Sequence, residues 1–179
     1  MAETGILIRR AQPEDADSVA AIYAHHVAHG TASFDTSPRT GPDTAGKIAD
    51  CNARGWPFLV AERDGRLVGY AYATQFRDRP AYASTCENSI YLDPAAIGHG
   101  VGTLLLAALI EASEQAGFRQ MIAVVGGAEP ASIALHRKLG FREAGRMISV
   151  GRKRGRWLDT VYLQLALGDG DSTPPSTEP

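Results

Sequence analysis

Three glycines at alternate positions, Gly98, Gly100 and Gly102, stand directly before an apolar run at 104–110. The run predicts a helix, and glycine lets a ligand approach the unpaired N–H groups of its first turn. Such a nest of amides suits a phosphate or a pyrophosphate. A tight connection without a ligand has the same spacing, so that interpretation stays open. No Gly-Lys-Ser/Thr follows, which argues against the phosphate loop of NTPases. The third glycine of the Rossmann dinucleotide-binding fingerprint is also missing.

Glu87 is the candidate general base. Alternation over residues 87–92 predicts a strand in which Glu87, Ser89 and Tyr91 share one face, opposite Ile90. An exposed carboxylate is a poor base toward an ammonium group, so we expect partial burial or a relaying water. A surface glutamate at a strand edge is the alternative.

His136, on a short predicted helix, is the second titratable candidate. It could donate a proton to a leaving group, and a satisfied, half-buried histidine explains it equally well. Three more histidines, His25, His26 and His29, end the first predicted helix. No cysteine or clustered carboxylate joins them in the sequence, so we expect no metal.

A polar loop over residues 75–82 carries Arg77, Arg79 and Tyr82. Two guanidinium groups and a phenol could hold a small carboxylate, because a guanidinium fork matches its geometry. A solvated surface loop is the alternative. Phe34 follows the first helix in a turn-rich segment, where it is either a wall of a substrate site or an ordinary packed aromatic.

Residues 97–102 resemble motif A of the GNAT superfamily of acetyl-CoA-dependent N-acetyltransferases, in which Gln/Arg-x-x-Gly-x-Gly/Ala cradles the CoA pyrophosphate. The resemblance runs from the N-terminal strand to about residue 167. Residues 86–92, 131–141 and 155–159 resemble the phosphinothricin and methionine sulfoximine acetyltransferase branch. It implies an α/β (α+β) GNAT fold: a mixed, mostly antiparallel twisted sheet with a parallel splayed strand pair and helices on both faces.

The same resemblance implies a role for each candidate. Glu87 would be the base, His136 would protonate the CoA sulfur, and a backbone N–H near Tyr91 would meet the oxyanion. The residues implied in acetyl-CoA binding are Ile90, Tyr91, Leu92, Ile97, Gly98, His99, Gly100, Val101, Gly102, Thr103, Glu129 and Ser132. Those implied in substrate binding are Phe34, Arg77, Arg79, Tyr82 and Glu87.

Two positions depart from the family pattern. Ile97 stands where arginine or glutamine is usual, so one phosphate contact is missing. Glu129 stands where an asparagine often precedes the last helix, and its carboxylate either weakens CoA binding or caps that helix.

The resemblance implies direct acetyl transfer to the α-amine of a small amino-acid-like substrate, such as phosphinothricin, methionine sulfoximine or methionine sulfone. It also implies a homodimer. One alternative is acetylation of a protein N-terminus or lysine. Another is an acetyl-CoA-binding module without turnover. Cys86 neighbours Glu87 and therefore faces the other way, which disfavours a covalent enzyme intermediate.

The elements that position these residues follow from periodicity and turn signals. Apolar alternation or continuity predicts strands at 6–10, 57–61, 67–73, 89–92, 120–125, 147–150 and 159–167. Helical spacing predicts helices that open near 13, 43, 101 and 130. A strand, helix and strand in succession at 89–125 imply a parallel pair.

Length and composition set outer limits. The 179 residues fit one domain over 1–167, followed by a disordered tail at 168–179 rich in Asp, Gly, Ser, Thr and Pro. A net charge of −2 gives no general attraction to nucleic acid or membrane. A late cluster of basic residues over 142–156 is either a solvated hairpin or faces CoA phosphates. Two cysteines without a secretory signal indicate reduced thiols and a cytoplasmic protein.

Overall fold

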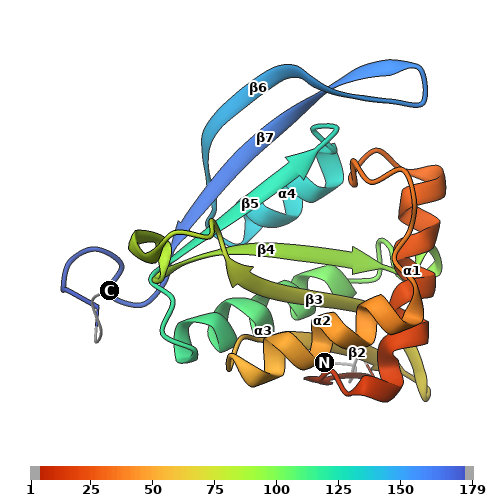
Figure 1. Ribbon diagram of the computed structural model, residues 1–179, viewed down its shortest axis with the longest axis horizontal. Coiled ribbons are helices and arrows are strands. Elements are labelled where there is room, and N and C mark those ends of the chain that lie inside the picture. Colours follow the sequence, from red (N-terminus) through yellow and green to blue (C-terminus); the bar gives the residue numbers. More distant parts are fainter. Residues whose placement is uncertain (1–4, 176–179) are drawn as a thin grey trace.

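The computed structural model describes residues 5–175 (Figure 1). Its strands are β1 (Ile6–Arg10), β2 (Phe58–Arg63), β3 (Arg66–Gln75), β4 (Thr85–Leu92), β5 (Gln120–Gly126), β6 (Arg142–Lys153) and β7 (Arg156–Ala166). Its helices are α1 (Ala16–His29), α2 (Gly41–Ala53), α3 (Val101–Gln115) and α4 (Pro130–Lys138), with short 3-10 helices at Pro13–Asp15, Pro80–Tyr82 and Pro94–Ala96.

The strands form one seven-stranded sheet in the order β1-β2-β3-β4-β5-β7-β6. Every neighbouring pair is antiparallel except β4 and β5, which α3 connects as a parallel pair. The predicted fold class is therefore confirmed: the sheet is mixed and mostly antiparallel, and the parallel pair lies where the sequence placed it.

Two apolar cores hold helices against opposite faces of this sheet. On one face, α3 buries Leu105, Leu106 and Leu109 completely against β2, β3 and β4. On the other face, α1 and α2 bury residues such as Val19 and Ile48 against the aromatic side chains of β2 and β3. Helical apolar spacing gives each helix one buried stripe, so the sheet is covered on both sides.

The parallel pair opens into a splay. Strands β4 and β5 pair only over 85–88 and 120–123, although β4 continues to Leu92 and β5 to Gly126. Figure 1 shows the two arrows diverging beyond that point, with α4 beside β5. The second half of β4 still pairs with β3, so its other edge is open toward β5.

Several predicted boundaries change. Strand β6 is much longer than the predicted 147–150, and β7 begins three residues before the predicted 159, because the basic stretch between them continues the ladder as far as the turn at Arg154 and Gly155. Helix α2 begins at Gly41, two residues early, because Thr40 and Asp43 form a capping box. The loop at 75–82 also contains a 3-10 turn that starts at Pro80.

The chain beyond β7 makes turns over residues 168–175. Arg119 donates hydrogen bonds to the carbonyls of Thr173 (3.0 Å) and Pro174 (3.2 Å). Residues 176–179, the end of the predicted tail, lie outside the described part, and the domain boundary near 167 stays a prediction. Within residues 5–175 we find no helix of the length and hydropathy that crossing a bilayer requires.

Candidate active site

The glycine turn before α3 has a left-handed backbone at two of its three glycines. Gly98 and Gly100 have φ of +83° and +80°, a region that side chains with a Cβ disfavour. A Cβ at either position would meet nothing within 4 Å, so the outer surface of the turn is open. At Gly102 a Cβ would lie 3.3 Å from Leu92 and Leu135, so this glycine lets α3 pack closely on its neighbours.

Helix α3 offers its N-terminus at this turn. Thr103 N–H bonds the Gly100 carbonyl (3.1 Å), and the amides ahead of it belong to the first turn, which has no intrahelical acceptors. The Lys138 ammonium lies beside them, where it donates to the Thr103 hydroxyl (3.3 Å). Amides, a helix N-terminus and one cation together fit a phosphate group.

A cavity of about 320 Å³ lies at the splay of β4 and β5. Its walls are residues 87–91 of β4, the second half of β5, α4 and the loop after α1, with one residue each from β3 and β7. Its lining residues are Ala32, Ser33, Phe34, Arg39, Tyr72, Glu87, Asn88, Ser89, Ile90, Tyr91, Ala123, Val124, Val125, Gly126, Ser132, His136 and Thr160. The structure thus brings Glu87, His136, Ser132 and Phe34, which the sequence singled out separately, into one cavity.

Glu87 projects into this cavity from β4 and is partly buried. Burial raises the pKa of its carboxyl group, and the positive charges of Arg77 and Lys47 oppose that rise only in part. A carboxylate with a raised pKa is a stronger base, which is what removal of a proton from an amine needs.

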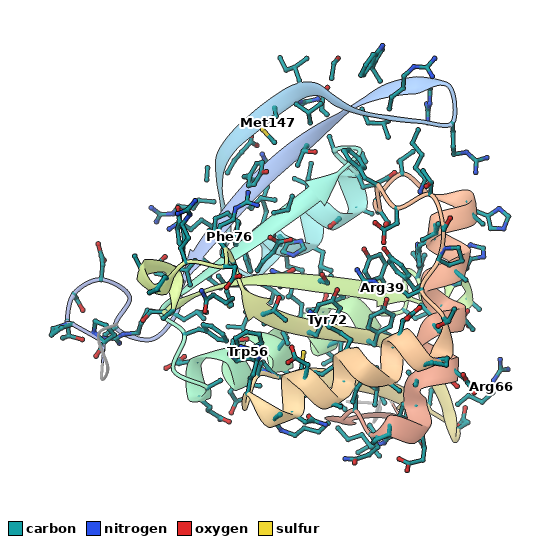
Figure 2. The ribbon with its side chains drawn as sticks, in the orientation of Figure 1. Arg39, Trp56, Arg66, Tyr72, Phe76 and Met147 are labelled. Carbon is teal, nitrogen blue, oxygen red and sulfur yellow. The ribbon has the colours of Figure 1, made fainter. Side chains whose placement is uncertain are left out.

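Arg39 is a cavity residue that the sequence analysis missed. Its guanidinium donates to the Tyr72 hydroxyl (3.3 Å) and lies 5.0 Å from the centre of the Tyr23 ring. Asp35 lies 3.9 Å away as a distant ion partner. Figure 2 shows Arg39 and Tyr72 side by side in front of β4. The sequence did hold one signal for Arg39: it is a cation on the same turn-rich segment as Phe34, next to the capping box that begins α2.

Three contacts hold the loop at 31–40 as a wall of the cavity. Thr31 donates a hydrogen bond to the Glu129 carboxylate at the start of α4. The Lys153 ammonium on β6 donates to the Ser33 carbonyl (2.7 Å). The Phe34 ring fills the space beside Gly151, where an added Cβ would lie only 2.2 Å from it. Glu129 and Lys153 are therefore occupied with this loop.

His136 is buried on α4 and its two ring nitrogens have partners. Nδ1 lies 2.8 Å from the Ser132 carbonyl oxygen, and Nε2 lies 3.1 Å from the Asn88 carboxamide. The ring packs edge-on against Phe141. Burial lowers the pKa of His136, so the neutral imidazole predominates near neutral pH.

The loop at residues 75–82, which was predicted to bind the carboxylate of a substrate, lies outside the cavity lining. The Arg77 guanidinium stacks on Phe76 (4.6 Å), and the Tyr82 ring meets Phe76 edge-on. Gln75 holds the carbonyls of Arg77 and Arg79 at 2.7 and 3.0 Å. The loop leaves the end of β3 that pairs with Glu87, so it flanks the base without lining the cavity.

The remaining residues predicted to bind the cofactor differ in how exposed their side chains are. Ile97 and His99 are exposed at the turn, whereas the Val101 side chain is fully buried in the core and can offer only its backbone. Ile90 and Tyr91 line the cavity. The Leu92 carbonyl accepts a hydrogen bond from His26 Nε2 (2.7 Å).

Cys86 is buried in the core on the α3 side of β4. Burial raises its pKa to about 12, so the thiol stays protonated. Neither its direction nor its protonation state suits a nucleophile, which supports direct transfer without a covalent enzyme intermediate.

The site geometry agrees with comparisons to known proteins. Residues 23–141 match the Acetyltransferase (GNAT) family. A phosphinothricin N-acetyltransferase of Alcaligenes faecalis is 47% identical over 176 residues, which cover 98% of this chain and 89% of that protein. An L-methionine sulfoximine/L-methionine sulfone acetyltransferase of Pseudomonas paraeruginosa is 39% identical over 171 residues, 93% of this chain and 98% of that protein.

A solved structure gives the same result. The GNAT superfamily phosphinothricin acetyltransferase of Sinorhizobium meliloti, in complex with AcCoA, has a TM-score of 0.94 and 44% identity over 96% of this chain and 94% of its own. The chain therefore belongs to the GNAT family of acetyltransferases. The exposed glycine turn and the open edge of β4 fit acetyl-CoA as the cosubstrate of such an enzyme.

Proposed function

We propose that this protein transfers an acetyl group from acetyl-CoA to the α-amine of a small amino-acid-like substrate of the phosphinothricin, methionine sulfoximine or methionine sulfone type. The observation that carries the proposal is the position of Glu87. Its partly buried carboxylate lines the cavity at the strand splay, on the element that leads to the glycine turn.

Different parts of the chain carry out the separate tasks of acetyl transfer. Acetyl-CoA supplies an activated acetyl thioester: the amine forms the C–N bond first and gives a tetrahedral oxyanion, and the C–S bond then breaks as CoA leaves as a thiolate that takes a proton from solvent. Glu87 accepts the proton that the attacking amine loses, directly or through a water. The open edge of β4 near Tyr91 supplies backbone N–H groups for the developing oxyanion. The amides of 97–103 and Lys138 hold the CoA diphosphate.

Cavity charges support a small zwitterionic substrate. Glu87 attracts the ammonium group, and Arg39 offers a guanidinium to a carboxylate in the same cavity. Arg77 and Arg79, on the loop beside Glu87, are proposed as a second cationic element at its mouth. The Phe34 loop walls the cavity, which favours a small amine over a protein N-terminus or lysine.

A thiol-release assay tests this function. Acetyl-CoA is incubated with methionine sulfone, phosphinothricin, a polyamine and a peptide with a free N-terminus. The proposal predicts thiol release with the first two and only background with the others. Equal rates with all four would overturn the small-substrate assignment. Binding of acetyl-CoA without release on any amine would favour a non-catalytic module.

We also propose that the protein is a cytoplasmic homodimer. Exposed apolar side chains gather on the last two strands, where Met147, Ile148, Val150 and Trp157 are 42%, 73%, 48% and 64% exposed. A second copy that covers them would remove apolar surface from water. Both cysteines are free and buried, which suits a reducing compartment.

A further inference from the structure

Asn88 lies where the two parallel strands separate. It is opposite Ala123 in the last pair of β4 with β5, and only 6% of its surface is exposed. It also lines the cavity. One atom of its carboxamide contacts His136, and the other is buried without a hydrogen-bond partner within residues 5–175. A buried amide atom without a partner costs free energy, so its presence in a cavity wall points to a ligand.

The proton position on His136 follows from its contacts. A carbonyl oxygen only accepts hydrogen bonds, so Nδ1, 2.8 Å from the Ser132 carbonyl, carries the proton. The ring is 2% exposed and neutral near neutral pH. In the neutral ring Nε2 then bears a lone pair, and that lone pair faces Asn88 at 3.1 Å.

A lone pair on Nε2 fixes which end of the Asn88 carboxamide faces it. If the oxygen faced Nε2, two acceptors would meet and the buried NH₂ group would bond nothing. If the NH₂ group faces Nε2, it donates a good hydrogen bond, and the carbonyl oxygen is the atom left without a partner. The second orientation satisfies both groups and leaves one acceptor for a ligand.

The face of β4 on which Asn88 lies indicates which ligand group donates a hydrogen bond to it. Successive strand residues point to opposite faces, so Asn88 faces α3 and α4, whereas Glu87 faces Arg39 and Tyr72. The glycine turn begins α3 on the Asn88 side. The group that reaches the splay from that turn is the pantetheine arm of acetyl-CoA, whose amides carry N–H donors.

We propose that His136 is a positioning residue that fixes the Asn88 carboxamide, and that the Asn88 carbonyl oxygen accepts a hydrogen bond from an amide N–H of the acetyl-CoA arm. This inference rests on the proposed function, because it requires acetyl-CoA in the cleft. It replaces the proton-donor role that the family resemblance implies for His136, since the one proton of the neutral ring is on Nδ1 and bonded to the Ser132 carbonyl, while Nε2, bonded to Asn88, carries none.

Nitrogen-15 NMR of the wild-type protein tests the first half without any variant or ligand. The proposal predicts that His136 shows a protonated Nδ1 and an unprotonated Nε2 near neutral pH. The opposite tautomer or an imidazolium would overturn it. Because this spectrum is recorded on the free protein, its result is independent of whether the protein acetylates any amine.

Calorimetric binding of acetyl-CoA tests the second half. Loss of one hydrogen bond in Asn88→Ala is expected to raise the Kd about tenfold. Val124→Ala trims an apolar side chain from the same cavity wall and is expected to raise it less. An unchanged Kd for Asn88→Ala, with the fold intact by circular dichroism, would contradict the proposal.

Two substitutions at His136 separate positioning from proton donation. Glutamine can still accept from the Asn88 NH₂ group through its carbonyl oxygen, whereas leucine cannot, and neither is an acid. The proposal predicts that His136→Leu raises the KM for acetyl-CoA about tenfold more than His136→Gln does. A proton donor predicts instead an equal loss of kcat in both variants with KM unchanged, and that result would overturn the proposal.

Discussion

At the residue scale, the cavity places one carboxylate and one guanidinium on the same side of β4. Glu87 projects from β4 itself, and Arg39 reaches in from the loop before α2, next to Tyr72 on β3. Opposite charges at two ends of a small cavity match a zwitterionic amino acid better than a simple amine. The substrate's carboxylate should therefore depend on Arg39.

Arg39→Gln is expected to raise the KM for methionine sulfone by about tenfold or more and to change kcat much less, because a charged hydrogen bond is lost in ground state and transition state alike. Wild-type enzyme should prefer methionine sulfone to its carboxamide, and the variant should lose that preference. Steady-state kinetics with both substrates measures this. Arg66→Gln, at the exposed first residue of β3 and outside the cavity lining, is the control. A larger effect from Arg77→Gln would locate the carboxylate at the cavity mouth instead.

At the element scale, the splay of β4 and β5 and the N-terminus of α3 together form the proposed cosubstrate site. The strand, the glycine turn and the helix were predicted from local patterns, whereas the splay was expected only from the family resemblance. The sequence could not predict the Lys138 contact with Thr103 or the Asn88 contact with His136, which join residues 35 and 48 positions apart. Such pairings depend on how α4 packs, and no local pattern encodes that.

The absence of a local pattern for tertiary contacts also explains why the sequence analysis chose Arg77 and Arg79 as candidates and missed Arg39. Arg77 and Arg79 were substrate-binding candidates because they stand together on a polar loop, yet the Arg77 guanidinium stacks on its neighbour Phe76. Arg39 stood in a segment with no regular pattern, and its place in the cavity depends on contacts of that loop with α4 and β6. Local spacing was enough to propose Glu87 as the base and the amides of 97–103 as a phosphate site, but it did not reveal the loop that becomes a cavity wall through tertiary contacts.

Lys138→Met is expected to raise the KM for acetyl-CoA about fivefold and to weaken its salt dependence, because the ammonium stands beside the diphosphate nest. S-acetylpantetheine, which lacks the diphosphate, should be used equally well by variant and wild type. Arg137→Met is the matched control, since Arg137 pairs with Glu143 instead. Equal losses with both acetyl donors would show that Lys138 acts through folding.

At the scale of the whole molecule, the site depends on two cores on opposite faces of the sheet. The α1 and α2 core carries the substrate wall, and the α3 core carries the glycine turn. Arg9 on β1 bonds both carboxylate oxygens of Asp15, at 2.7 and 2.9 Å, and so ties the sheet edge to the entry of α1. These hydrogen bonds from Arg9 lower the pKa of the Asp15 carboxyl group.

This pair gives a pH-dependent prediction. A lowered pKa means that the stabilisation is fully present above the ordinary aspartate pKa of about 4, and is lost as pH falls through the lower folded-state value. Asp15→Asn should lower the free energy of unfolding near neutral pH by about 2 kcal/mol, or Tm by about 4–8 °C. The difference should shrink as the pH falls below the ordinary aspartate pKa and through the lower folded-state pKa of Asp15. Asp50→Asn, which breaks an exposed pair with Arg54, should have little effect. Equal losses at both positions would contradict the argument.

The exposed apolar surface of the last two strands predicts the oligomeric state. Sedimentation should give twice the chain mass of 19.1 kDa for the wild type. Ile148→Lys places a charge on the most exposed apolar side chain there and should shift the protein toward the monomer. Leu7→Lys, an exposed apolar position on β1 at the far edge of the sheet, should leave the mass unchanged. A monomeric wild type would refute the proposed dimer.

The most direct measurement compares wild type with Glu87→Gln in thiol release from acetyl-CoA with methionine sulfone, alongside acetyl-CoA binding by calorimetry. Removing the base should lower kcat about 100-fold or more and leave the acetyl-CoA Kd within about twofold. In the wild type kcat/KM should fall as pH drops through a Glu87 pKa above that of an exposed glutamate. Undiminished turnover by Glu87→Gln would contradict the central claim that this carboxylate takes the proton from the amine.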